Sequence, residues 1–203
     1  MHISIENLSK RFDSGWVFRD LNISIQAGQK VAVTGPNGSG KSTLLNILCG
    51  LLSPSLGTVT YVMHEKHIDR DDIYKYISIS AAYSELDEEL SPRELFTHYS
   101  NFKSFRIDSL EKFLELAQLE DARDKPVVYF SSGMKQRLSL ALALTMDSPL
   151  LFLDEPSSFL DDTRKSWFYE LFHAYVEGKT VFLASNDKAD LDLCDTSILL
   201  MGS

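Results

Sequence analysis

One glycine-rich segment constrains this chain more than any other part of its sequence: Gly35-Pro36-Asn37-Gly38-Ser39-Gly40-Lys41-Ser42. It follows the apolar run 31–33 and opens a stretch, 42–49, that is predicted to be a helix. In that setting successive backbone N–H groups wrap a β-phosphate, and glycines stand where a Cβ would block the approach. A plain glycine-rich turn is the alternative, and the flanking strand and helix disfavour it. The segment predicts a P-loop, with Lys41 at the β- and γ-phosphates and Ser42 on Mg²⁺.

Two acidic residues, Asp154 and Glu155, follow the continuous apolar run 150–153. Such a run is typical of a strand buried on both faces of a parallel sheet. Ligands of open α/β sheets bind at the carboxyl ends of their strands, where the P-loop also lies. We therefore expect Asp154 to hold the Mg²⁺ shell and Glu155 to orient a water for in-line attack. An acidic turn that simply ends a strand is the alternative, and the P-loop disfavours it.

The C-terminal half alternates between predicted strands and a helix. After the strand 150–153, a helix capped by Asp161 or Asp162 runs to Glu177, and Gly178 stands at its left-handed C-cap. Two more strands are predicted at 180–184 and 198–201. Strand, helix and strand in this order indicate right-handed βαβ units, and so an α/β fold with a parallel sheet.

The N-terminal part has a different pattern. Segments 3–5 and 21–25 alternate with period two, as half-exposed antiparallel strands do. Segments 58–63 and 76–80 are predicted to extend that sheet. Capping-box spacings at 91–94, with proline at the first helical position, and at 108–111 begin two helices. We expect one domain, residues 1–203, with an N-terminal antiparallel β subdomain and a helical subdomain at about 83–128.

Composition excludes several classes of protein. The 203 residues carry 20 Lys and Arg against 29 Asp and Glu, a net charge of −9, which disfavours nucleic-acid binding. Two cysteines without metal-ligand spacing fit a reducing compartment. The longest apolar stretches, 44–52 and 138–145, fall short of the roughly 18 residues of a membrane span, and the start lacks the apolar region of a signal peptide. We expect a soluble, cytoplasmic protein.

Three further segments carry a family resemblance. The segment 130–137, Phe-Ser-Ser-Gly-Met-Lys-Gln-Arg, looks like the signature segment of the ABC ATPase (nucleotide-binding) domains, and 158–161 resembles the D-loop that follows. Phe12 falls where that family keeps an aromatic ring that stacks on adenine. Read from the residues alone, 130–137 is also consistent with a helix N-terminus capped by Ser131, and Phe12 with core packing. The ordered set covers essentially the whole chain.

This resemblance implies a P-loop NTPase core that hydrolyses ATP to ADP and phosphate, and it implies the following site residues. ATP binding is assigned to Phe12, Gly35, Pro36, Asn37, Gly38, Ser39, Gly40, Lys41, Ser42 and Thr43; catalysis to Glu155, Lys41 and Asn186; Mg²⁺ to Ser42 and Asp154; the partner's ATP to Ser131, Ser132, Gly133 and Met134; the D-loop to Asp161.

With a single P-loop and a single signature, the resemblance further implies a head-to-tail dimer, a homodimer, with two ATPs at its interface. It implies a separate integral membrane transport subunit that holds the chain at the inner face of the cell membrane. The chain is similar to the ATPase of a bacterial exporter-type system.

Two positions depart from the family pattern. Ala82 stands where a glutamine is usual, and Asn186 where a histidine usually touches the γ-phosphate. Asparagine donates a hydrogen bond, but it carries no charge and cannot take up or release a proton as histidine does. Two alternatives therefore stay open: a nucleotide-dependent dimerisation switch with weak hydrolysis, and a soluble non-transport ABC ATPase. The signature segment disfavours a P-loop kinase.

Weaker motifs are interpreted as structural. The segment 64–67, His-Glu-Lys-His, is predicted to be a solvated loop between strands rather than a metal site. Cys49 and Cys194 are predicted to be buried fillers. The acidic run 85–89 is predicted to be a solvated approach to the cap at Ser91, with a surface for a basic partner as the alternative.

Overall fold

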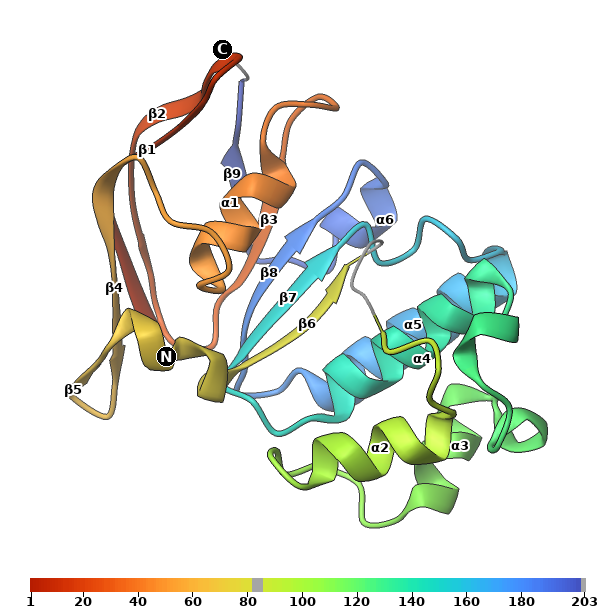
Figure 1. The fold of residues 1–203 in the computed structure, drawn as a ribbon. Helices are drawn as coiled ribbons and strands as arrows, with labels where there is room; N and C mark the ends of the chain where they lie inside the picture. Colours follow the sequence, from red (N-terminus) through yellow and green to blue (C-terminus); the bar gives the residue numbers. More distant parts are fainter. Residues whose placement is uncertain (82–85, 202–203) are drawn as a thin grey trace. The chain divides into compact units, whose positions relative to one another are not determined.

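The computed structural model describes residues 1–81 and 86–201, which form two compact units (Figure 1). Unit 1 comprises Met1–Ile77, Pro149–Glu155 and Gly178–Ser203, and unit 2 comprises Ser78–Ser148 and Pro156–Glu177. Because the chain leaves unit 1 and returns to it twice, residues far apart in the sequence share one compact body. Each unit is considered by itself.

Unit 1 contains an antiparallel sheet with the strand order β2-β1-β4-β5. Its strands are β1 (His2–Phe12), β2 (Gly15–Ile25), β4 (Leu56–Met63) and β5 (Lys66–Ile68). Ile3 pairs with Ile25 and both are buried, as the period-two pattern predicts. His64 and Glu65, both at positive φ and exposed, form the turn between β4 and β5, as the predicted solvated loop requires. The prediction was wrong for Lys66 and His67, which belong to β5, although both are exposed.

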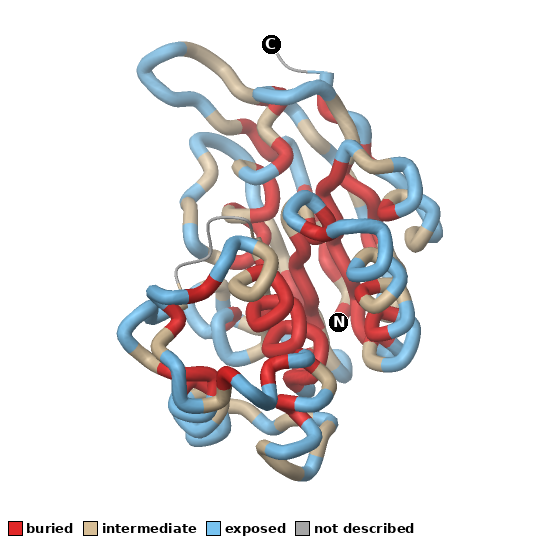
Figure 2. Tube along the Cα trace, turned by 90° about the vertical axis from the view of Figure 1, so that its right-hand side faces the viewer, coloured by how far each residue is buried: buried red, intermediate tan, exposed pale blue. Residues whose placement is uncertain are grey.

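A second, parallel sheet has the strand order β6-β7-β8-β3-β9. Unit 1 contributes β3 (Lys30–Thr34), β7 (Leu150–Asp154), β8 (Thr180–Ala184) and β9 (Thr196–Leu199). Every residue of β8 is buried, and helix α1 (Lys41–Leu48) lies against β7 and β8. Figure 2 colours the buried residues of the chain red. The predicted α/β fold is confirmed. The last strand begins and ends two residues earlier than predicted.

The prediction for β6 (Ile77–Ala81) was wrong, because this strand is the edge strand of the parallel sheet and does not extend the antiparallel one. The alternation of isoleucine and serine indicates a strand with a solvated serine face. In the structure the serines are the buried residues: Ser78 and Ser80 are 3% and 0% exposed. The Ser80 hydroxyl forms a 2.8 Å hydrogen bond with that of Ser139, which satisfies the buried oxygen.

Unit 2 is mainly helical, with α2 (Pro92–Ser100), α3 (Leu110–Ala117), α4 (Ser132–Thr145) and α5 (Asp162–Tyr175). Short 3₁₀ turns occur at Glu120–Ala122 and Val127–Tyr129, and a further one, Arg70–Tyr76, lies in unit 1. The core of unit 2 includes Phe113, Val127 and Leu138, all fully buried. Helices α2 and α3 lie within the predicted helical segment 83–128, and α4 and α5 lie beyond it.

Helix caps in unit 2 follow the sequence signals with one displacement. Ser91 caps α2 in a complete capping box with Glu94. The box predicted at 108–111 is shifted by one residue: Ser109 caps α3 and Asp108 instead pairs with Lys112 at 2.9 Å. Aspartate and serine are both strong caps, so adjacent candidates compete for one position.

Helix α5 is capped by Asp161 and ends at Tyr175, two residues before the predicted end. Its apolar side is anchored by Phe168 and Phe172, both fully buried. Gly178 follows at φ +76°, so the predicted left-handed glycine is present beyond the last helical turn.

Candidate functional site

The P-loop connects β3 to α1, and its glycines are required by close packing within unit 1. Gly35 and Gly40 have φ of +144° and +99°, a region that favours glycine. A Cβ on Gly35 would lie 2.2 Å from the Leu200 carbonyl oxygen, and one on Gly40 would lie 2.3 Å from Cγ1 of Val17. Phosphate access is therefore not the only reason for glycine at these two positions, since no side chain fits there.

Three predicted catalytic residues are brought together by hydrogen bonds. Lys41, only 7% exposed, donates from Nζ to the Gly35 carbonyl oxygen at 3.0 Å and to Oδ1 of Asn186 at 3.2 Å. Asn186 donates from Nδ2 to Oδ1 of Asn37 at 2.8 Å and to Oε1 of Glu155 at 3.1 Å. Lys41 begins α1, Glu155 follows β7, and Asn186 follows β8. The carboxyl ends of two parallel strands thus meet the helix N-terminus.

Glu155 occupies a strained backbone position at the end of β7. Its φ is +50°, which is uncommon for a residue with a long side chain. Its N–H donates to the Ala184 carbonyl oxygen at 2.8 Å, which ties the residue after β7 to the last residue of β8. Burial raises the pKa of the Glu155 carboxyl, and the nearby Lys41 ammonium opposes that shift. This carboxylate is therefore fixed at the backbone and desolvated at its side chain.

Asp154 carries an unsatisfied buried oxygen. Its Oδ1 has no hydrogen-bond partner, and a side-chain hydrogen bond joins the carboxylate to Ser42. Burial raises the pKa of Asp154, while the Ser42 hydrogen bond and the Lys41 charge lower it. A hydroxyl and a carboxylate side by side are hard oxygen donors, the kind that Mg²⁺ prefers.

Mg²⁺ commonly uses one or two protein ligands together with substrate phosphates and waters. In residues 1–81 and 86–201, no three His, Cys, Asp or Glu side chains gather to hold a metal by themselves. The residues present therefore fit an ion that arrives with a phosphate ligand.

The turn after β8 is stabilised by a buried polar pair that sequence reasoning missed. Ser185 donates from Oγ to Oδ2 of Asp190 at 2.7 Å, and both residues are essentially inaccessible to solvent. Asp187 caps the short helix α6 (Lys188–Leu191) by accepting from the Ala189 N–H at 2.9 Å. The available signal was a serine and an aspartate five residues apart around a predicted turn.

Phe12 ends β1 with 45% of its surface exposed, so its ring is not a core residue as the packing alternative required. The Lys10 ammonium lies 4.8 Å from the ring centroid. Val17, which belongs to the strand paired with β1, is the residue that closes on Gly40. The hairpin that carries Phe12 is therefore packed on the P-loop through its second strand.

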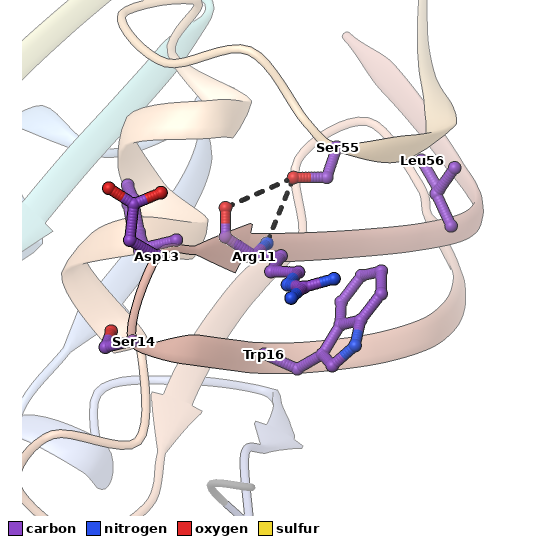
Figure 3. A pocket seen from close by; sticks show the side chains of 7 residues that line it. Arg11, Asp13, Ser14, Trp16, Ser55 and Leu56 are labelled. Carbon is purple, nitrogen blue, oxygen red and sulfur yellow. Dashed lines mark hydrogen bonds between the residues drawn. The ribbon is translucent and has the colours of Figure 1, made fainter.

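A groove of about 1010 Å³ lies at the tip of this hairpin (Figure 3). The Arg11 guanidinium lies over the Trp16 ring, with Cζ 5.8 Å from the ring centroid. The backbone N–H of Arg11 donates to Oγ of Ser55 at 3.0 Å. The lining residues are Arg11, Phe12, Asp13, Ser14, Trp16, Ser55 and Leu56. None of them belongs to the P-loop, so the groove adjoins Phe12 but not the Lys41 cluster.

The signature segment lies in unit 2 at the start of α4. Ser131 is the N-cap, accepting from the Met134 N–H at 3.3 Å, so the capping interpretation is confirmed. Ser132 is exposed, and Gly133 and Met134 are half-buried. Gln136 donates to the Pro156 carbonyl oxygen at 2.8 Å, which fixes the segment after Glu155 to the signature helix.

The D-loop residue Asp161 caps α5 by accepting from the Arg164 N–H at 2.9 Å, and it pairs with the Arg164 guanidinium. It belongs to unit 2, as the signature does. Ala82, the position where the sequence departs from the usual glutamine, lies outside the described residues.

Cys49 is buried as predicted, but the prediction was wrong for Cys194, which is half-buried. Burial raises the pKa of the Cys194 thiol to about 12. In the acidic run, Asp87, Glu88 and Glu89 are exposed and Glu88 pairs with Lys135; Glu85 lies outside the described residues. No helix in the described part of the chain is long and apolar enough to cross a membrane.

A P-loop, two carboxylates after a buried strand and a parallel sheet define a P-loop nucleotide-binding domain. The family model described as "ABC transporter" matches residues 18–158. Nod factor export ATP-binding protein I of Bradyrhizobium diazoefficiens is 32% identical over 207 residues, covering 98% of this chain and 67% of that protein. The same-named protein of Rhizobium johnstonii is 33% identical over 206 residues, covering 98% and 66%.

ABC transporter A family member 7 of Dictyostelium discoideum is 29% identical, covering 99% of this chain and 25% of that protein. The chain thus spans about two thirds of the length of the Nod factor export proteins and a quarter of this larger relative. Among solved structures, the dimeric post-hydrolysis state of the ATP-binding cassette MJ0796 with ADP and Pi has a TM-score of 0.83 at 26% identity. That match covers 98% of this chain and 94% of the other.

The chain belongs to the ABC transporter family and has the fold of an ATP-binding cassette.

Proposed function

We propose that this chain hydrolyses ATP as a head-to-tail homodimer and thereby powers transport by a separate membrane-spanning subunit. The observation that carries the proposal is the hydrogen-bonded set of Lys41, Asn186 and Glu155 beside Asp154. It combines a cation for phosphates, a carboxylate for water and a polar bridge between them. In this reading residues 1–203 work as one cassette with a helical subdomain at about 83–128.

ATP binds along the P-loop in this proposal. Backbone N–H groups of the loop and the positive end of α1 face the phosphates, and Lys41 turns from the Gly35 carbonyl oxygen to the β- and γ-phosphates. The exposed ring of Phe12 stacks on adenine. The ATP-binding set is Phe12 with Gly35, Pro36, Asn37, Gly38, Ser39, Gly40, Lys41, Ser42 and Thr43.

Ser42 and Asp154 are proposed to hold Mg²⁺ with the nucleotide. The buried, unpaired Oδ1 of Asp154 supports this assignment, because a desolvated carboxylate oxygen gains most from a cation. When bound, the ion supplies neutralisation of charge on the β- and γ-phosphates.

Glu155 is proposed to accept a hydrogen bond from the attacking water and to take its proton. Asn186 holds Oε1 of Glu155 through Nδ2, which orients the carboxylate at the end of β7. Lys41 stabilises charge that develops on the transferred phosphoryl group.

The second copy completes each site in this proposal. Ser131, Ser132, Gly133 and Met134, at the positive end of α4, face the γ-phosphate of the partner's ATP, with Asp161 at the same interface. The dimeric MJ0796 cassettes, which resemble this chain at 26% identity, support that arrangement. The export function named for the Nod factor relatives supports a membrane-spanning partner and a place at the inner face of the cell membrane.

One observation favours a second function, a nucleotide-dependent dimerisation switch with weak hydrolysis. The residue that bridges Lys41 and Glu155 is a neutral amide, which cannot place a positive charge at the γ-phosphate. The two functions differ in turnover at saturating ATP.

The dimer proposal is tested by mixing two inactive variants. Lys41→Ala disables a P-loop, and Ser131→Arg disables a signature. A head-to-tail dimer with one chain of each variant has one of its two sites intact. About half of the dimers in an equimolar mixture are of this kind, so the mixture recovers up to about a quarter of the wild-type turnover. If the mixture stays as inactive as its components, each site is built within one chain and the head-to-tail dimer is rejected.

The transport role is tested by purifying the tagged chain from its native cells. We expect an integral membrane protein to co-purify in stoichiometric amount. Recovery of the chain without any membrane protein, together with turnover, would favour the soluble ABC ATPase instead.

A further inference from the structure

The buried Ser185–Asp190 pair, which has no part in the proposed chemistry, lies next to the site. Asp190 is 0% exposed and Ser185 is 1% exposed. The hydroxyl donates to the carboxylate at 2.7 Å, a short hydrogen bond to a charged acceptor. Carboxylates are seldom fully buried unless they are paired or hydrogen-bonded.

The Ser185 hydroxyl makes a second hydrogen bond. Oγ accepts from the backbone N–H of Asp187 at 3.0 Å while it donates to Asp190. Because the hydroxyl hydrogen points at Asp190 as a hydrogen-bond donor, the lone pairs of the oxygen are free to accept from the Asp187 amide. One hydroxyl therefore fixes the residues on both sides of Asn186.

Asn186 uses this fixed backbone to reach across the site. Its amide contacts Lys41 at 3.2 Å and Glu155 at 3.1 Å. The Glu155 backbone is itself tied to Ala184, the residue before Ser185, by a 2.8 Å hydrogen bond. The backbones of both Asn186 and Glu155 are thus held at the carboxyl end of β8.

We propose that Asp190 is a positioning residue for ATP hydrolysis: through Ser185 it holds the Asn186 amide against Glu155 and Lys41. This inference rests on the proposed function. It assigns Asp190 no contact with nucleotide. Its charge orients the Ser185 hydroxyl, and the hydroxyl sets the turn from which Asn186 projects.

The first test compares Asp190→Asn with Asp192→Asn. Asparagine keeps the volume at 190 but weakens the hydrogen bond from Ser185, whereas Asp192 is 66% exposed and pairs only loosely with Lys188 at 3.9 Å. We expect kcat of Asp190→Asn to fall about tenfold to a hundredfold, the effect of a misplaced catalytic contact. The Kd for a non-hydrolysable ATP analogue with Mg²⁺ stays within about twofold. Asp192→Asn behaves as wild type. Equal losses in kcat and affinity contradict the inference.

A double-mutant cycle separates positioning from a general loss of structure. If Asp190 acts through Asn186, Asp190→Asn has no further effect on kcat in an Asn186→Ala background. If it only supports the fold, the two losses multiply, and the inference is overturned. Asp190→Ala and Ser185→Ala, each checked by thermal melting, give the same cycle should Asp190→Asn retain the hydrogen bond.

A final measurement does not depend on turnover. The side-chain amide of Asn186, identified in NMR spectra by its loss in Asn186→Ala, is expected to shift or broaden in Asp190→Asn and not in Asp192→Asn. An unchanged signal overturns the positioning role. A wild-type protein without turnover contradicts the proposed function instead, and leaves this measurement to decide the positioning role.

Discussion

The Lys41 ammonium donates a hydrogen bond to Oδ1 of Asn186 over 3.2 Å, although the two residues lie 145 positions apart. On its other side the same amide donates to Glu155. An amide has an acceptor and a donor that do not titrate near neutral pH. It therefore joins a cation to a carboxylate without competing for their protons.

Loss of Lys41 is expected to remove ATP binding. In Lys41→Ala the point charge at the β- and γ-phosphates is absent, so affinity for ATP with Mg²⁺ becomes undetectable or strongly weakened in calorimetry. Lys66→Ala, at an exposed lysine of β5, is the matched control and binds normally. Comparable affinities of Lys41→Ala and wild type would refute the P-loop assignment.

Glu155→Gln is expected to lower turnover at least about a hundredfold, the range for losing a general base, while ATP binding persists. The amide keeps the shape of the carboxylate but cannot take a proton. The variant also accumulates as an ATP-bound dimer in light scattering, since hydrolysis separates the halves. Glu170→Gln, on the exposed face of α5, serves as control. A monomer under saturating ATP and Mg²⁺ would contradict the shared-site model.

Asp154→Asn is expected to remove the contribution of Mg²⁺ to nucleotide affinity. The buried Oδ1 of Asp154 has no hydrogen-bond partner, so the charged carboxylate binds a cation strongly. A neutral amide in its place binds the cation much more weakly. Calorimetry of ATP with Mg²⁺ and with EDTA should give two different affinities for wild type and one for the variant. An undiminished Mg²⁺ effect would show that other oxygens hold the ion.

Asn186→His is expected to raise kcat about twofold to thirtyfold. A charged hydrogen bond contributes about 1.5–3 kcal/mol against roughly 1 for a neutral one, and the difference is converted at 1.36 kcal/mol per decade. The gain should appear in kcat more than in KM, because the contact strengthens as charge develops. Unchanged or lower kcat in a folded variant would show that the turn is built around the amide, and would favour the dimerisation switch.

Gly40→Ala is expected to destabilise the protein more than Gly178→Ala. Both positions have positive φ, which costs about 1–2 kcal/mol for a residue with a Cβ. Around Gly178 the space is open, whereas at Gly40 the Val17 side chain must move, which adds about 1–3 kcal/mol. Denaturant unfolding measures the difference. An equal decrease in the free energy of unfolding for the two variants would show that Val17 moves away from position 40 at no cost.

The sequence alone predicted Lys41, Asp154 and Glu155 as neighbours because each belongs to a local signal that follows a buried strand, whereas Asn186 was assigned only through the family resemblance. A loop or acidic pair follows a buried strand, and parallel strands bring their carboxyl ends to one edge. Such signals need no knowledge of which strands are adjacent. That is why the site was predictable before the order of the sheet.

Where tertiary context decides, sequence patterns failed. Ser78 and Ser80 in β6 look solvated but are buried, since small hydroxyl groups can satisfy each other inside a sheet. Strand β1 extends well past the predicted end because register shifts after Ile5 and Leu8 interrupt the period of two. The Ser185–Asp190 pair has no periodic signature at all.

The left-handed backbone of Glu155 carries a consequence for the history of such chains. Glycine would relieve the strain at φ +50°, so a lineage selected for robustness alone should drift toward glycine at position 155. The glutamate at this position therefore costs stability that a glycine would not cost. Only a use of the carboxylate, such as the proposed one, offsets that cost.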